Sequence, residues 1–239
     1  MKEFYAFARL AIDACPDGLS AMTHRIVAGS SPSSQPSAKQ NWWRERILTP
    51  IASIQSSFEL LLDLHVYVGQ YPYGGTRISP MAHLRFNVQS YFQEVYVIRQ
   101  RTIDLLNIAK KEFETRDDGT SVAETCDRLC RDLKPRIEAA IEPRREHVHK
   151  WGFNTYSFAW LDAIELVLNA NPELLDKSAR HKFKTFFDEK YSEERQLWSD
   201  AFEEANEVIG EILDDCAREL KLVFFDTSGQ LRYPLPTGE

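Results

Sequence analysis

The stretch PMAHLRFNVQSYFQEVYVIRQRTIDLLNIAKKEFETR, from Pro80 to Arg116, decides the predicted fold. Its apolar positions alternate four and three residues apart, at Leu84, Val88, Tyr91, Val95, Ile98, Thr102, Leu105 and Ala109. This spacing puts one apolar stripe along an α-helix and is typical of helical bundles and coiled coils. Further apolar residues widen the stripe: Phe92, Tyr96, Ile103, Leu106 and Phe113. We therefore predict one long helix over 80–116.

The rest of the chain also has helical periodicity. We predict helices over 2–14, 41–70, 121–142, 155–169, 171–191 and 192–220, separated by a linker rich in Ser, Pro and Gly over 29–40 and a loop over 71–80. Pro135 and Pro143 lack an amide donor, so we expect each to kink a helix or to begin a new one. A turn at Ser228-Gly229 suggests a short hairpin or an extended tail.

These elements predict an all-α fold, an up-and-down helical bundle with additional N- and C-terminal helices and a short C-terminal hairpin or extended tail. We divide the chain into an N-terminal helix and flexible linker over 1–40, a helical bundle over 41–225 and a tail over 226–239. Trp42, Trp43, Trp151 and Trp160 are expected to anchor the core or an interface.

Composition limits the location and the partners. Net charge is −7, so no overall field attracts the protein to nucleic acid and any polyanion site must be local. Charged residues interrupt the apolar start of the chain, which argues against a signal peptide. The most apolar stretch, over 47–68, contains Glu59, Asp63 and His65, which argue against a membrane span. Four cysteines are too few for a disulfide framework. We expect a cytoplasmic protein that does not contact a membrane.

One segment is locally basic. From Arg128 to Lys150 there are seven Lys or Arg residues (128, 131, 134, 136, 144, 145 and 150) against four acids (132, 138, 142 and 146). The predicted last helix is acidic by contrast. The basic segment could hold a phosphate, although a basic solvated helix face is the commoner explanation of such a pattern.

The basic segment ends in EPRREHVHKWGF, from Glu142 to Phe153, which contains an R-x4-H pattern formed by Arg144 and His149. On a straight helix these two residues lie about 140° apart, so one chain presents them poorly to a single ligand. Arg145 shares a face with His149, and Arg144 shares one with His147. A second copy packed about a two-fold axis would complete such a site.

The pattern and its helical context resemble the HEPN superfamily, whose hallmark is an R-x4-to-6-H motif late in a helical bundle. The resemblance covers roughly residues 80–170 and includes the long helix with SYFQEVYVIRQRTIDLLNIAKKEF before the motif. Arg145 stands where this family usually has a small polar residue. The resemblance implies a metal-independent endoribonuclease that works as a homodimer without a cofactor, of the toxin or phage-defence kind. An antitoxin or a nucleotidyltransferase is then the expected partner protein.

Elementary chemistry agrees with these residue types. RNA carries its own nucleophile, the 2′-hydroxyl group. His149 would act as general acid or base near neutral pH, and Arg144 would clamp the phosphate charge. Arg145, Glu146 and His147 would support the pair. The alternative is a HEPN-like helical dimer without catalysis, a binding module for nucleotide, RNA or protein.

Other residues allow two readings each. Arg99, Arg101 and Lys150 would contact RNA, but arginines on a long helix more often pair with acids, here Glu94 and Asp104. Cys126 and Cys130, four residues apart, would form a Cys2His2 zinc site with His147 and His149. Buried free thiols are the commoner outcome for such cysteines, and we predict no metal site.

Overall fold

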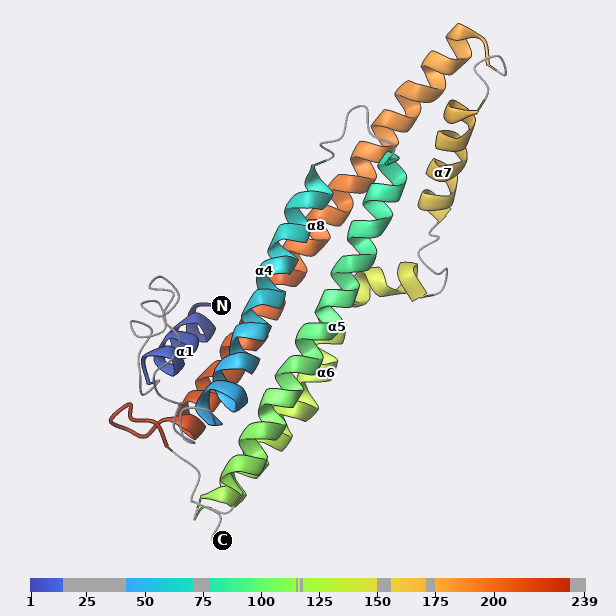
Figure 1. Cartoon of the computed structure of the whole chain (residues 1–239). Coiled ribbons are helices and arrows are strands. Elements are labelled where there is room, and N and C mark those ends of the chain that lie inside the picture. The colour runs from blue at the N-terminus through green and yellow to red at the C-terminus, as the bar shows by residue number, and fades with distance from the viewer. Residues whose placement is uncertain are drawn as a thin grey trace, which may run out of the picture. The chain divides into compact units, whose positions relative to one another are not determined.

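A computed structural model describes residues 1–14, 42–70, 78–114, 116, 118–149, 156–170 and 175–232, with the side chains of 142–149, 156 and 157 left out. The helices in Figure 1 are α1 (Lys2–Asp13), the π-helical η1 (Arg44–Leu48), α4 (Thr49–Gly69), α5 (Pro80–Phe113), α6 (Gly119–His149), α7 (Tyr156–Asn169) and α8 (Lys177–Phe224). The only β structure among the described residues is a single antiparallel bridge between Phe225 and Leu231. The all-α prediction is confirmed for this part of the chain.

The helices divide between two compact units. Unit 1 contains residues 1–58, 97–137 and 209–239, and unit 2 contains residues 59–96 and 138–208. The four long helices α4, α5, α6 and α8 each contribute residues to both units. The predicted linker over 29–40 and most of the predicted loop over 71–80 lie outside the described residues.

An aromatic cluster organises unit 1. The rings of Phe7, Trp43, Phe113, Phe224 and Phe225 pack at centroid separations of 5.6–6.4 Å, and all five side chains are buried. The Trp43 indole also donates a hydrogen bond of 2.9 Å to the Ala11 carbonyl. Because α1, the segment before η1, the end of α5 and the end of α8 all supply rings, the cluster fixes four distant segments together.

A carboxylate holds the start of α1 in unit 1. Asp214 on α8 accepts a hydrogen bond of 2.9 Å from the Phe4 amide and pairs at 2.6 Å with the α-amino group of Met1. The first amides of a helix have no partner within it, and the helix dipole favours a negative charge there. Asp214 therefore supplies from α8 the N-terminal cap that the α1 sequence lacks.

Tyr91 is the centre of unit 2. Its ring stacks on Phe202 with centroids 3.6 Å apart, and its hydroxyl donates a 2.8 Å hydrogen bond to the Asn206 side-chain carbonyl. Trp198 packs against Phe92, Phe158 and Phe202 beside this pair. Burial raises the pKa of the Tyr91 hydroxyl, so it stays a neutral donor.

The helix predicted over 121–142 extends further, because α6 runs through Pro135 and Pro143 to His149. We expected each proline to kink a helix or to begin a new one, and no new helix begins at either. Leu133 and Ile137 are buried on either side of Pro135, and each contributes about 1.5–3 kcal/mol by leaving water. Pro135 is exposed, so water can replace the hydrogen bond that its missing amide cannot make. Burial of the apolar face therefore outweighs the loss at the proline.

The two helices predicted over 171–191 and 192–220 are one helix, α8. Side chains four residues apart connect the two sides of the predicted break. Phe187 stacks on Tyr191 with centroids 5.7 Å apart, and the Arg195 guanidinium lies 5.3 Å from the Tyr191 ring centroid. Such pairs stabilise a helix, and no Gly or Pro stands between them to end it.

The predicted apolar stripes are largely right. All eight residues of the α5 stripe are at most 1% exposed. On α8 the predicted register fails at Leu197 and Val208, which are exposed, while the following residues Trp198 and Ile209 are buried. Trp43 is in the core as expected, but Trp160 is 51% exposed.

The region Arg44–Gly69 is long and apolar enough to cross a membrane by length and composition, the only such helix in the described part of the chain. Core helices of globular proteins satisfy the same criteria. Here Ile51, Ile54 and Leu61 are buried against the rest of the protein. The helix therefore does not distinguish between the two settings.

Two glycines provide a matched test of packing. A Cβ atom at Gly119 would lie 2.4 Å from the Glu114 carbonyl oxygen, whereas one at Gly210, inside α8, would make ordinary contacts of 3.4 Å or more. We expect Gly119→Ala to lower the free energy of unfolding by roughly 1–3 kcal/mol. Gly210→Ala should be neutral or stabilising by up to about 1 kcal/mol, because alanine favours a helix interior. Urea denaturation measures both, and equal effects would contradict the tight turn at Gly119.

Candidate functional site

The Arg144/His149 motif lies at the C-terminal end of α6, in unit 2. The backbone from 144 to 149 is helical and continuous with the rest of α6, so both residues belong to one helix. The side chains of Arg144, Arg145, Glu146, His147 and His149 lie outside the described residues, as does Lys150 altogether.

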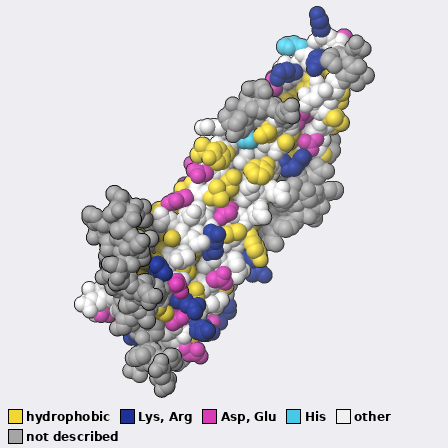
Figure 2. All heavy atoms as spheres, in the orientation of Figure 1, with side chains coloured by type: hydrophobic (Ala, Val, Ile, Leu, Met, Phe, Trp, Pro, Cys, Tyr) yellow, Lys and Arg dark blue, Asp and Glu magenta, His cyan; other side chains and the backbone are white. Residues whose placement is uncertain are grey.

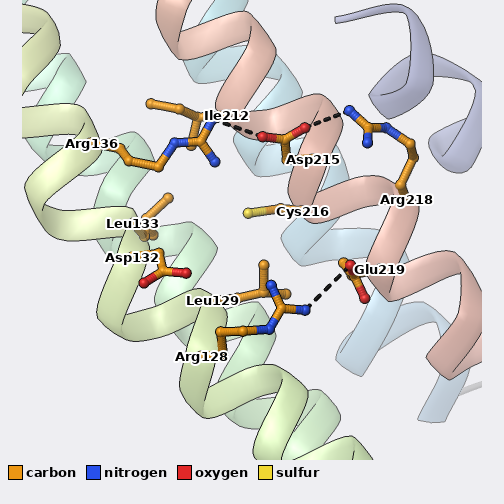
Figure 3. Close-up of a pocket in the computed structure, with 10 residues that line it drawn as sticks. All are labelled: Arg128, Leu129, Asp132, Leu133, Arg136, Ile212, Asp215, Cys216, Arg218 and Glu219. Carbon is orange, nitrogen blue, oxygen red and sulfur yellow. Dashed lines mark hydrogen bonds and ion pairs between the residues drawn. The ribbon is translucent and has the colours of Figure 1, made fainter.

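Earlier in α6, described members of the basic segment are paired with acids of α8. Arg128 lies 3.3 Å from Glu219, and Arg136 lies 2.7 Å from Asp215 (Figure 3). Asp215 also contacts Arg218 of its own helix. These ion pairs balance two of the positive charges that the sequence shows here. At these two positions the structure agrees with the commoner explanation of such a pattern, a solvated helix face whose charges are paired.

A small cavity of about 130 Å³ lies between α6 and α8 in unit 1. Its lining combines three arginines and three acids with a few apolar side chains and one thiol: Arg128, Leu129, Asp132, Leu133, Arg136, Ile212, Asp215, Cys216, Arg218 and Glu219. Figure 3 shows the charged side chains bridging the two helices around Cys216. Small-molecule sites usually measure about 300–1,000 Å³, so the cavity is too small for a nucleotide. Its equal numbers of opposite charges give it no preference for an anion.

The cysteines of the two helices are buried or half-buried thiols. Burial raises the pKa of Cys126 to about 11 and that of Cys216 to about 12, and it also raises the pKa of the half-buried Cys130. Among the described residues no three potential metal ligands come together. The zinc reading would need His147 and His149, whose side chains lie outside them. Burial and raised pKa values are what free thiols in a protein core usually show.

Thiol labelling tests this assignment. We expect iodoacetamide at pH 8 to modify Cys130 at least about tenfold faster than Cys126 or Cys216, because the thiolate is the reactive form and both other thiols are buried with raised pKa values. Mass spectrometry of the labelled native protein gives the rate at each position. Labelling of Cys216 as fast as Cys130 would contradict its burial, and urea-unfolded protein is the control in which the three rates should converge.

Arg101 holds two helices of unit 1 together. Its guanidinium donates a hydrogen bond of 2.8 Å to the Ser53 carbonyl of α4 and another to the Ser57 hydroxyl. Asp104, proposed from the sequence as an ion-pair partner, instead accepts a hydrogen bond from Gln100. Arg99 is half-buried on the same helix. Arg101 therefore has a structural role, with a backbone carbonyl and a hydroxyl in place of a carboxylate.

A substitution separates this role from RNA contact. Arg101→Ala leaves the Ser53 carbonyl and the buried Ser57 hydroxyl without their donor, which should lower the free energy of unfolding by roughly 1–3 kcal/mol. Both hydrogen bonds come from one guanidinium nitrogen, Nη1, so Arg101→Lys, which keeps the charge and offers one nitrogen with three donors, should recover part of the loss. Thermal unfolding measures both variants. A variant as stable as wild type but weaker in RNA binding would show instead that Arg101 contacts RNA.

A polar cluster in unit 2 was not predicted. His83 and Asn87 are four residues apart on α5, with Nε2 and Nδ2 separated by 3.1 Å, and Asn87 also donates to the His83 carbonyl. Burial and the nearby Arg195 of α8 lower the pKa of His83, which favours the neutral imidazole. The i, i+4 spacing of His83 and Asn87 could be seen in the sequence. The approach of Arg195 could not, because this residue lies on a helix more than a hundred residues away.

Comparisons with protein-family models, curated proteins and solved structures found no match for this chain.

Proposed function

We propose that this protein is a metal-independent endoribonuclease of the HEPN type that acts as a homodimer. The observation that supports the proposal is the position of the motif. Arg144 and His149 lie on one uninterrupted helix, α6, which directly follows the long helix α5. This order of helix, helix and motif is that of the superfamily the sequence resembles.

The proposed reaction needs only groups that the motif supplies. The 2′-oxygen of a ribose attacks the adjacent phosphorus, a new P–O bond forms and the bond to the 5′-oxygen breaks, which leaves a 2′,3′-cyclic phosphate and a 5′-hydroxyl. His149 transfers the proton, and Arg144 stabilises the charge on the phosphorus oxygens. Arg145 and Glu146 orient the pair, and Lys150 adds a phosphate contact.

The dimer follows from the helix geometry. Two side chains about 140° apart cannot both face one phosphodiester from a single straight helix. A second α6 related by a two-fold axis can present its His149 beside the Arg144 of the first copy. We therefore propose two equivalent composite sites per dimer. A toxin or phage-defence role, with an antitoxin or nucleotidyltransferase as partner, belongs to the same proposal.

Loss of the imidazole tests catalysis. We expect His149→Ala to lower the rate of RNA cleavage by about 10²–10⁴-fold with an unchanged melting temperature, and wild-type cleavage to persist in EDTA. Arg144→Ala should have a comparable effect. His181→Ala, which removes an exposed histidine of α8 outside the motif, is the matched control and should keep full activity. Mass spectrometry of the products should show 2′,3′-cyclic phosphate ends.

A non-catalytic binding module is the second candidate. The pairing of Arg128 with Glu219 and of Arg136 with Asp215 favours it, because these contacts leave less positive charge for a polyanion. This candidate predicts no cleavage of any RNA by wild type and unchanged partner binding by His149→Ala. RNA cleavage that His149→Ala abolishes would exclude it.

A further inference from the structure

Exposed hydrophobic side chains are concentrated in unit 2. Of the sixteen large hydrophobic residues that are exposed in the described part of the chain, fourteen belong to unit 2, and only Tyr5 and Leu222 belong to unit 1. Figure 2 shows such side chains gathered on the surface over α4 and α5. Monomeric proteins rarely expose large contiguous apolar patches, so this distribution indicates an interaction surface in unit 2.

Helix α7 shows this exposed hydrophobic surface most clearly. Its charged residues contact the rest of unit 2, and several of its apolar residues are exposed. Its sequence YSFAWLDAIELVLN contains only two charged residues, Asp162 and Glu165. Both interact with the start of α5: Asp162 pairs with Arg85, and Glu165 is hydrogen-bonded to the Ser79 side chain and the Met81 backbone. Burial raises the pKa of Glu165. Both acids of the helix are therefore engaged within unit 2.

The opposite face of α7 is apolar and exposed. Ala159, Trp160, Ala163, Leu166 and Val167 occupy one sector of about 120°, opposite the buried Leu161 and Ile164. Trp160 is 51% and Leu166 is 71% exposed. An amphipathic surface helix of a globular protein normally turns its charged residues outward and its apolar residues inward. This helix has apolar residues on both sides, which is typical of a helix that packs against two partners.

We propose that a second copy of this chain covers the exposed face of α7, through antiparallel packing of two α7 helices about a two-fold axis at Ala163. The spacing of the face is symmetric about that residue. Trp160 and Leu166 lie three positions on either side of Ala163, and Ala159 and Val167 lie four positions on either side. A two-fold axis there brings Trp160 of each copy against Leu166 of the other, and Ala159 against Val167.

Size and charge also fit this occupant. Alanine at the axis lets two helices approach closely, while the larger residues fill the space on both sides. The face has no charge, so the two-fold axis brings no like charges together. A surface of anionic lipid or nucleic acid fits less well, since the only charged residues of α7 are acidic. Five side chains per copy form a contact below the roughly 1,600 Å² of a standard interface, so the dimer should dissociate on dilution.

This inference goes beyond the proposed function and does not rest on it. Residues 138–208, which include both the motif and α7, belong to one unit. Antiparallel packing of two α7 helices puts their N-terminal ends, which the motif precedes in the chain, at opposite ends of the pair, so the α7 interface is a surface separate from the composite site. Self-association and catalysis are measured separately, so either can fail alone. A dimer that cleaves no RNA would overturn the ribonuclease and leave the α7 interface standing, whereas cleavage by the monomeric protein would overturn the composite site.

A matched pair of substitutions tests the interface. We expect Leu166→Glu to raise the dimer dissociation constant by roughly 30-fold or more, as expected for a central interface residue. Leu222→Glu is the control, because Leu222 is also a leucine in a helix, is 68% exposed and lies in unit 1. It should leave the dissociation constant unchanged. Sedimentation equilibrium of the full chain over a concentration series gives all three constants, and circular dichroism checks that both variants remain helical.

A second variant tests the position of the axis. Residues on a two-fold axis meet their own copies, so Ala163→Cys should form a disulfide-linked dimer under mild oxidation that Leu222→Cys does not form. The interface is overturned if wild type is a monomer at all concentrations, or if the two glutamate variants dissociate alike. A dimer in which Ala163→Cys cross-links no better than Leu222→Cys would also contradict it.

Discussion

The apolar stripe of α5 is the constraint on which both units depend. Its residues stay on one face for the length of the helix because they recur at the helical period, and none of them is more than 1% exposed. Tyr91 and Val95 of the stripe belong to unit 2, while Ile98 and Leu105 belong to unit 1. A polar side chain in place of Val95, Ile98 or Leu105 would lose burial worth about 1.5–3 kcal/mol and would add a polar group to the core.

Charged residues then decide which helix faces remain available. Asp214 caps α1, and Asp162 and Glu165 interact with the start of α5. In each case an acid meets a helix start or a cation in its own unit, where it contributes most. On α7 the consequence is that no charge remains for the outer face. The stability of unit 2 and the proposed self-association therefore have a common origin.

The sequence predicted long periodic elements well and chain breaks poorly. The α5 stripe was correct because eight residues repeat the same signal, whereas the kink or new helix start expected at Pro135 rested on one residue. Local preferences of one or two residues lose to a buried face that continues past them, as Leu133 and Ile137 show in α6. The exposed Trp160, predicted to anchor the core or an interface, shows a related limit. Hydrophobic character predicts a contact, but it does not say whether the partner is the same chain.

The candidate site shows the same limit for charge. Counting Lys and Arg along the sequence indicated a basic segment, but Glu219 and Asp215 approach Arg128 and Arg136 from a helix some eighty residues away. Helical periodicity cannot reveal such pairs, because they depend on how α6 and α8 pack in unit 1.

The pairing of Arg128 and Arg136 with acids changes the physical argument for RNA binding. A polyanion site on α6 then draws its positive charge from the exposed Arg131 and Lys134 and from the last turns of the helix, where Arg144 and Arg145 precede His149. Two copies of the motif at one composite site double that positive charge. This is a second physical reason for the proposed enzyme to work as a dimer, in addition to the angle between Arg144 and His149.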